Sequence, residues 1–253
     1  MIQILMPFRN VAPWLRKSIN SIQDQTVKDW SCYLIDDGAT DGSDQIAKEI
    51  SKADKRFIYC CPMRLENHKW TRYRAYQLGC YQFAYRMGRG IIPQDICVSI
   101  DGDDWLPDQF VFQRVCNAYS SPETWLTYGS YVLDSGELGR CNSPTDPKLI
   151  RSMPHTASAL KTWKSFLFDK IRLEDFYGPD GEPLRAAGDT MIMMAMVEMA
   201  GSHAVYMPEI NYVYNKQNPE SNFRIRREEQ MRNYEYLRAL PSYEPLKDVS
   251  CEF

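Results

Sequence analysis

Residues 96–104 read ICVSIDGDD, an apolar run that passes directly into three aspartates within four positions. The run from Ile96 to Ile100 has the length and the β-branched composition of a buried strand. Asp101, Asp103 and Asp104 are therefore expected at the carboxyl end of a central strand, where open α/β sheets bind their ligands. This strand end is the first candidate for a ligand site.

The N-terminal residues predict repeated α/β units. Ile2 to Met6 has the pattern of a buried strand that stops at Pro7, and Trp30 to Ile35 has the pattern of the next strand. Apolar residues recur at helical spacing between them. A second helical pattern then leads to a third strand at Phe57 to Cys60. This alternation indicates an α/β fold with helices packed against the sheet.

The rest of the chain is less regular. We expect a helix from Trp70 to Met87, a helix starting at Pro107, a strand from Trp125 to Tyr131, a long excursion from Ser135 to Pro154, a helix from Ala157 to Phe168, a methionine-rich helix from Gly188 to Gly201, strands at Ala204–Met207 and Ile210–Tyr214, and a last helix from Arg224 to Leu240. Methionines on all faces of their helix predict that it is buried. We expect one α/β domain over residues 1–223 and a C-terminal helical tail over 224–253.

The composition argues against a disordered, collagen-like or coiled-coil chain, and the charge argues against a nucleic-acid-binding protein. The 253 residues are 44% hydrophobic and 25% charged, as in ordinary folded domains. The formal net charge of −3 provides no strong field for phosphate backbones. We therefore expect no nucleic-acid partner.

Cysteine usage and hydropathy favour a cytoplasmic protein. The eight cysteines include no C-x-x-C pair, which fits a reduced, intracellular setting. The N-terminus lacks the basic segment of a signal peptide. The longest apolar run, Met191 to Val197, has seven residues, whereas a spanning helix needs about 20. Contact with a membrane would then be peripheral.

The acidic cluster itself predicts a metal site. Two carboxylates about 4 Å apart repel by roughly 4 kcal/mol at an effective dielectric constant of about 20, and a divalent cation relieves this repulsion. Oxygen ligands suit Mg²⁺ or Mn²⁺, whose shell is usually completed by water and substrate phosphates. The alternative is a solvated acidic turn, since Asp-Gly and Asp-Asp are common in turns.

A second acidic segment follows the strand that ends at Ile35. Asp36 and Asp37 precede Gly38 and are expected at the same edge of the sheet as Asp101. A carboxylate at that place can accept a hydrogen bond from a ribose hydroxyl or a uracil imide. A simple turn is the alternative here too.

These segments together resemble the family-two glycosyltransferases of the GT-A fold. The matching segments are residues 4–10 (ILMPFRN), 18–26 (SINSIQDQT), 30–43 (WSCYLIDDGATDGS), 99–104 (SIDGDD), Gly188-Asp189 before a helix and residues 212–215 (YVYN). The resemblance covers residue 2 to about residue 221. It implies a Rossmann-like GT-A domain with a mixed central sheet flanked by helices.

The resemblance also implies a role for individual residues. The ligand would be a nucleotide-diphosphate sugar, its diphosphate bound through Mn²⁺ or Mg²⁺, and transfer would invert the anomeric carbon. The implied donor-binding residues are Pro7, Arg9, Asp36, Asp37, Asp101 and Gly102, with Asp101 facing ribose or metal. Asp103 is the main implied metal ligand, with Asp104 assisting. Asp189 matches the catalytic base.

Asp189 has two interpretations. An acceptor hydroxyl is a poor nucleophile near neutral pH, and a carboxylate that removes its proton accelerates attack by typically 10²–10⁴-fold. Alternatively, Asp189 is an N-cap of the helix that it precedes, worth about 1 kcal/mol. The family pattern favours the base.

The sequence departs from the family at one metal ligand. Members often carry a histidine a few residues after the position of Tyr214, and here no histidine follows His203. Gln217, Asn218 or water are the candidates to take its place. His155 lies on a stretch that shapes the sugar pocket in such enzymes, although a structural role is the alternative.

Two basic regions are further candidates for contacts with a ligand or a membrane. Lys69, Arg72 and Arg74 lie beside Trp70 and could place a cation near the diphosphate, the alternative being a solvated helix face. The last helix mixes arginines with glutamates. It is either a peripheral contact with an anionic membrane or an ordinary solvent-facing helix.

Taken together, the sequence predicts a metal-dependent glycosyltransferase. We expect a UDP-linked sugar as donor and a hydroxyl of a glycan or glycoconjugate as acceptor. The alternatives are a nucleotidyltransferase and a catalytically degenerate nucleotide-sugar-binding module. A Rossmann dehydrogenase is disfavoured, because no G-x-G-x-x-G follows the first strand.

Overall fold

The computed structural model describes residues 1–66, 69–72, 75–86, 91–139, 146–152 and 157–247. Seven strands form a central sheet in the order β3-β2-β1-β6-β8-β7-β9, and β4 and β5 form a separate hairpin. The strands are β1 Ile2–Phe8, β2 Trp30–Asp36, β3 Phe57–Cys60, β4 Met63–Glu66, β5 Lys69–Arg72, β6 Ile96–Ser99, β7 Leu126–Leu133, β8 Lys161–Lys164 and β9 Ala204–Tyr214.

The sheet is mixed, as expected. Strands β3, β2, β1 and β6 are parallel, β8 runs antiparallel between β6 and β7, and β7 and β9 are parallel. The helices are α1 Ala12–Gln23, α2 Ser43–Ala53, α3 Tyr76–Arg86, α4 Val111–Ala118, α5 Ser165–Asp169, α6 Gly188–Ala200, α7 Asn222–Ile225 and α8 Arg227–Ala239.

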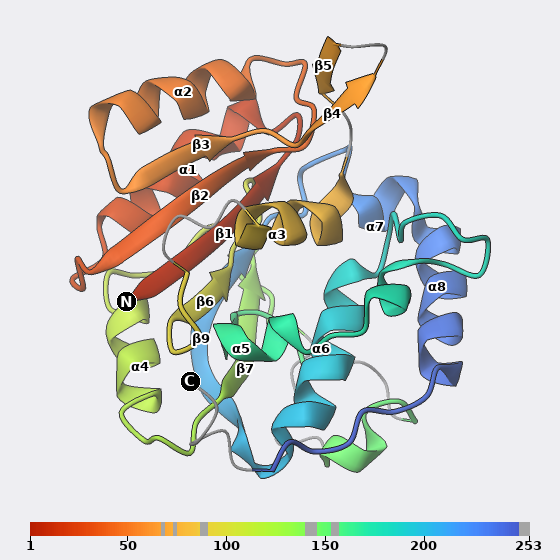
Figure 1. The fold of residues 1–253 in the computed structure, drawn as a ribbon. Coiled ribbons are helices and arrows are strands. Elements are labelled where there is room, and N and C mark those ends of the chain that lie inside the picture. Colours follow the sequence, from red (N-terminus) through yellow and green to blue (C-terminus); the bar gives the residue numbers. More distant parts are fainter. Residues whose placement is uncertain (67–68, 73–74, 87–90, 140–145, 153–156, 248–253) are drawn as a thin grey trace.

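Helices cover both faces of the sheet (Figure 1). Strand β1 sends Leu5 into the core beneath α3 and α6, and Ile4 into the core beneath α1 and α4. Because both faces are covered, the strand is an almost continuous apolar run, as is usual for parallel sheets. The methionine-rich helix α6 is buried along nearly its whole length, which confirms the prediction for its core role.

The helix expected from Trp70 is wrong in its first part. Residues Lys69–Arg72 form β5, which pairs antiparallel with Met63–Glu66. Helix α3 begins only at Tyr76, where the Asp37 carboxylate accepts the backbone N–H groups of Ala75 and Tyr76 at 2.5 and 3.0 Å. This cap from a distant loop sets the helix start.

The helix expected from Ala157 to Phe168 is also wrong. Residues Lys161–Lys164 form β8, and only Ser165–Asp169 are helical. β8 pairs with β6 on one side and β7 on the other, which gives its backbone groups partners in the sheet, and Trp163 packs in the core. This sheet context outweighs the local helical pattern.

Two smaller differences occur near the C-terminus. The expected strands at 204–207 and 210–214 form one strand, β9, whose pairing with β7 has register shifts near Ser130. The expected last helix is divided into α7 and α8. The described ends of the excursion at 135–154 contain a 3₁₀ turn at Pro147–Leu149.

The segment after α8 returns along α6 (Figure 1). Tyr243 donates through its backbone N–H to Glu198, and Leu246 donates to the Met199 carbonyl. Arg151 forms an ion pair of 2.6 Å with Glu198. None of the helices in the described residues is long and apolar enough to span a membrane.

Candidate active site

Two acidic segments leave the same edge of the sheet. Asp37 follows β2 and Asp101 follows β6, and both strands are parallel neighbours of β1. The end of β1 holds both loops: the Asp37 amide donates to the Phe8 carbonyl at 2.9 Å, and the Gly102 amide donates to the Pro7 carbonyl at 3.1 Å. The backbone of Pro7 therefore positions residues 101–104, the acidic loop.

Gly102 has no room for a side chain. A Cβ at this position would lie 2.5 Å from the Cβ of Phe8 and 3.3 Å from a methyl carbon of Val11. Only glycine allows the loop to approach β1 this closely. Asp101 and Asp103 flank this contact and are fixed by it.

The first acidic segment is engaged within the protein. One oxygen of Asp36 accepts the Gly38 and Ala39 amides at 3.0 and 2.8 Å, and the other accepts the Tyr59 hydroxyl at 2.7 Å. Asp37 caps α3, as described above. Both carboxylates thus shape the loops at this edge of the sheet, and their contact with uracil or ribose stays a prediction.

Asp101 is held by side chains from two other elements. Its backbone N–H donates to the Tyr212 hydroxyl at 3.1 Å, and its Oδ1 accepts from Nε2 of Gln77 at 3.2 Å. Tyr212 belongs to β9 and Gln77 to α3. The start of the acidic loop is therefore tied to both sides of the sheet.

Asp104 is turned into the protein. It is 1% exposed, and its two oxygens accept the Tyr212 hydroxyl at 2.7 Å and the Asn215 amide at 2.8 Å. Asp103 instead accepts from Nδ2 of Asn218 at 2.7 Å. The two predicted metal ligands thus have different surroundings, and Asp104 is the one whose oxygens are committed to internal bonds.

Asn218 is the amide that reaches the acidic loop from the segment lacking a histidine. It is buried, whereas Gln217 is exposed and donates to Asp134 at 2.6 Å. Of the two side chains considered for the histidine's place, only Asn218 contacts Asp103 among the described residues.

The carboxylates share one electrostatic environment. Burial raises the pKa of Asp101 to about 6, while Lys161 opposes the shift and Asp103 and Asp189 add to it. Burial also raises the pKa of Asp103 and of Asp104, and for Asp104 the charges of Asp103 and Asp101 are further causes. Negative charge at this edge is therefore unfavourable unless positive charge offsets it.

Asp189 lies in the first turn of α6 and reaches the same edge. The N-cap position belongs to Ala187, which has a φ of +62°, and no side-chain bond caps the helix. The carboxylate of Asp189 instead forms an ion pair of 3.0 Å with Nζ of Lys161. Its position therefore differs from that of an N-cap, the alternative considered for it.

Sequence reasoning missed Lys161, because the surrounding segment was expected to be helical. Residues 160–164 read LKTWK, whose apolar and polar residues do not alternate, so the sequence offers no clear strand signal there. β8 is antiparallel to β6 and places Lys161 opposite Ser99, immediately before the acidic loop.

The other predicted basic residues are more dispersed. Arg9 lies just beyond β1, and its guanidinium is 3.6 Å from Glu220. Lys69 and Arg72 belong to β5. Arg74 and His155 lie outside the described residues, so their roles stay predictions.

Comparison with known protein families identifies the family of this chain. The family model for glycosyl transferase family 2 matches residues 3–178, which contain both acidic segments and β8. The chain belongs to glycosyl transferase family 2. The resemblance seen in the sequence is thereby confirmed.

Named members of the family are similar over different parts of the chain. The uncharacterized glycosyltransferase EpsJ of Bacillus subtilis (strain 168) is 36% identical over 238 residues, covering 87% of this chain and 62% of EpsJ. Glycosyltransferase GlyA of Streptococcus pneumoniae serotype 4 (strain ATCC BAA-334 / TIGR4) is 30% identical over 110 residues, 44% of this chain and 14% of GlyA. The chain spans less than two thirds of each relative.

Solved glycosyltransferase structures have the same fold. TarS 1–349 of S. aureus, in complex with UDP-GlcNAc, has a TM-score of 0.62 at 15% identity, covering 87% of this chain and 59% of TarS 1–349. Mannosyltransferase PcManGT from Pyrobaculum calidifontis, in complex with GDP-Man and Mn²⁺, has a TM-score of 0.59 at 17% identity, covering 92% of this chain and 62% of PcManGT. The family-two chain therefore has the GT-A fold.

Asp101, Asp103 and Asp189 lie at one edge of the sheet, the acidic edge. Their side chains fit a divalent cation bound with substrate. In the described part of the chain, no three His, Cys, Asp or Glu side chains are grouped as a closed metal site. Mg²⁺ sites need no such cage, because one or two carboxylates and substrate phosphates suffice. Asp101 and Asp103 supply oxygen donors of the right kind. Their raised pKa values indicate carboxylates that a cation would stabilise.

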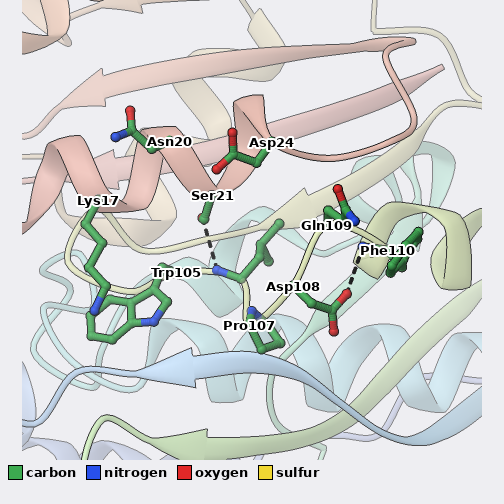
Figure 2. Close-up of a pocket in the computed structure, with 10 residues that line it drawn as sticks. Lys17, Asn20, Ser21, Asp24, Trp105, Pro107, Asp108, Gln109 and Phe110 are labelled. Atoms are coloured by element: carbon green, nitrogen blue, oxygen red, sulfur yellow. Dashed lines mark hydrogen bonds between the residues drawn. The ribbon is translucent and has the colours of Figure 1, made fainter.

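A separate groove of about 860 Å³ lies between α1 and the chain that follows the acidic loop (Figure 2). Residues 105–110 form one side of it and α1 the other. At one end, Nζ of Lys17 is 3.2 Å from the centre of the Trp105 ring. None of the predicted site residues lines this groove, so we assign the candidate active site to the acidic edge instead.

Proposed function

We propose that this family-two chain transfers a sugar from a UDP-linked donor to a hydroxyl of a glycan or glycoconjugate. The reaction would depend on Mn²⁺ or Mg²⁺ and invert the anomeric carbon. One observation carries the proposal: the start of α6 is joined to the strand beside β6 by the ion pair of 3.0 Å between Asp189 and Lys161, and Lys161 is paired with Ser99, two residues before Asp101. Solved structures of the same fold with UDP-GlcNAc, UDP or GDP-Man support a nucleotide-sugar donor.

Asp103 and Asp101 are the proposed metal ligands. Asn218 and Gln77 hold their carboxylates, so the two groups are positioned before a cation arrives. The bound cation would stabilise the negative charge that develops on the departing diphosphate. Asp104 would assist indirectly, because its hydrogen bond with Tyr212 anchors the acidic loop to β9.

Asp189 is the proposed catalytic base. Its side chain remains 35% exposed, so an acceptor hydroxyl can approach it from solvent. As a carboxylate it would accept the hydroxyl proton during attack on the anomeric carbon. The sugar–oxygen bond to the diphosphate breaks as the new glycosidic bond forms.

A panel of nucleotide sugars tests this function. The chain is incubated with Mn²⁺, candidate glycan acceptors and UDP- or GDP-linked donors, and released nucleotide is measured. We expect release from a UDP-linked sugar. The Asp189→Asn variant should bind UDP with unchanged affinity and transfer about 10²–10⁴-fold more slowly.

The same assay separates the two alternatives. A nucleotidyltransferase would release no nucleotide from these donors, and when supplied with a nucleoside triphosphate and a sugar phosphate it would join them into a nucleotide sugar and release pyrophosphate. A degenerate binding module would bind UDP without releasing nucleotide from any donor. Either result would contradict the proposed transfer.

We place the reaction in the cytoplasm, in accord with the free cysteines among the described residues. A peripheral membrane contact would use α8 and its neighbour α7, which expose Met231 and Ile225 beside arginines. Sedimentation with vesicles containing anionic lipid tests this contact. Equally strong binding to vesicles of neutral lipid would contradict an electrostatic contact.

A further inference from the structure

A lysine is buried at the centre of the acidic edge. Lys161 is 7% exposed, and its Nζ lies 3.0 Å from Oδ2 of Asp189. Its position is set by the register of β8 against β6, which places it opposite Ser99. The lysine therefore reaches the site from a rigid strand in the middle of the sheet.

The charge on Lys161 is kept by its neighbours. Burial lowers the pKa of Lys161, but Asp189 and then Asp101 raise it, and the net shift is upward. A buried ammonium is costly unless it is paired, and the Asp189 carboxylate 3.0 Å away supplies the partner.

We propose that Lys161 is the positioning residue of this site: its ammonium holds the Asp189 carboxylate at the acidic edge. This inference rests on the proposed function, in which Asp189 is the base. Lys161 would act through Asp189 and would not itself touch the reacting atoms.

Lys161→Met tests the inference, with Lys164→Met as the matched control. Lys164 lies three residues along the same strand, and its ammonium donates to the Gln94 carbonyl at 2.9 Å, away from the site. We expect Lys161→Met to lower kcat about 10- to 100-fold, the scale expected when a catalytic group is misplaced. The Kd for UDP with Mn²⁺ should change less than about twofold. Lys164→Met should leave both values unchanged.

Folding of the variant is addressed separately. Methionine fills most of the volume of the lysine side chain, and Asp189 stays partly solvated after the ion pair is lost. Lys161→Gln keeps a hydrogen-bond donor but no charge, and it should show the same loss of kcat. A variant that binds UDP normally is folded, so its kcat can be compared directly.

A double-mutant cycle decides between positioning and independent action. Because Lys161 acts through Asp189, Lys161→Met should slow the Asp189→Asn enzyme less than about twofold. A further 10-fold loss in the double variant, or an unchanged kcat in Lys161→Met, would overturn the inference. The wild type is measured in the same assay. If it is inactive on every donor, the proposed function fails; if it is active, the variants test the role of Lys161 alone.

Discussion

The Tyr212 hydroxyl donates to the Asp104 carboxylate at 2.7 Å, although 108 positions separate the two residues in the chain. The same oxygen accepts the Asp101 amide at 3.1 Å. One phenol on β9 therefore fixes both ends of the acidic loop. This contact explains how a loop of four residues carries three aspartates in a defined arrangement.

Tyr212→Phe should lower the free energy of unfolding by about 1–3 kcal/mol, because the buried Asp104 carboxylate would lose a donor. Urea unfolding at pH 7 measures this. Tyr214→Phe is the matched control, since its hydroxyl has no hydrogen bond within the described residues. Equal losses in the two variants would contradict the role given to Tyr212.

Asn218→Ala should weaken the Mn²⁺-dependent binding of UDP about fivefold, since Asp103 would lose a hydrogen bond worth about 1 kcal/mol. Gln217→Ala serves as control, because Gln217 contacts Asp134 instead of the acidic loop. Calorimetric titration of both variants provides the comparison. If Gln217→Ala has the larger effect, Asn218 is not the residue that supports Asp103.

The metal-free protein should gain stability from Asp101→Asn at pH 8. The pKa of Asp101 is raised by burial to about 6 in the folded chain, above its ordinary value of about 3.9. Its charge therefore costs stability fully above pH 6, and this cost fades as the pH falls toward 4. Urea unfolding in EDTA should show an advantage for the variant that shrinks over the same interval.

Asp54→Asn is the control of opposite sign. The hydrogen bond from Arg56 lowers the pKa of Asp54 to about 2, so this carboxylate stabilises the fold above pH 4 and loses that effect as the pH falls through 2. The variant should be less stable than wild type at pH 8. An Asp101→Asn variant that is also destabilised at pH 8 would contradict the electrostatic interpretation.

Gly102→Ala should destabilise the fold by about 1–3 kcal/mol, because its Cβ would overlap with the Cβ of Phe8. It should also weaken UDP binding in the presence of Mn²⁺, because Asp101 and Asp103 must move. Thermal unfolding and UDP titration measure the two effects. A variant with wild-type stability would show that the close approach to β1 is not required.

The first half of the fold could be predicted because its patterns are local. The strand at Phe57–Cys60 was predicted to the residue, and both acidic strand ends were predicted at one edge because parallel neighbours share it. Helix α3 could not be placed, because its start depends on a carboxylate from Asp37, 38 positions away.

The second half depends on contacts that sequence spacing does not show. Strand β8 has four residues and is defined by its two neighbours in the sheet, so Lys161 was not recognised as part of the site. The contact between Asp103 and Asn218 spans 115 positions. Asp103 is predicted from the acidic strand end and Asp189 from the family pattern, whereas the residues that hold them are visible only in the structure.

The most direct test is a calorimetric titration of wild type and Asp103→Asn with UDP, in the presence and absence of Mn²⁺. We predict that Mn²⁺ strengthens UDP binding to wild type at least 10-fold, and that this gain is lost in Asp103→Asn while metal-free binding is retained. Binding that is equally strong without Mn²⁺, or a full gain in the variant, would contradict a metal-assisted nucleotide-sugar site at the acidic loop.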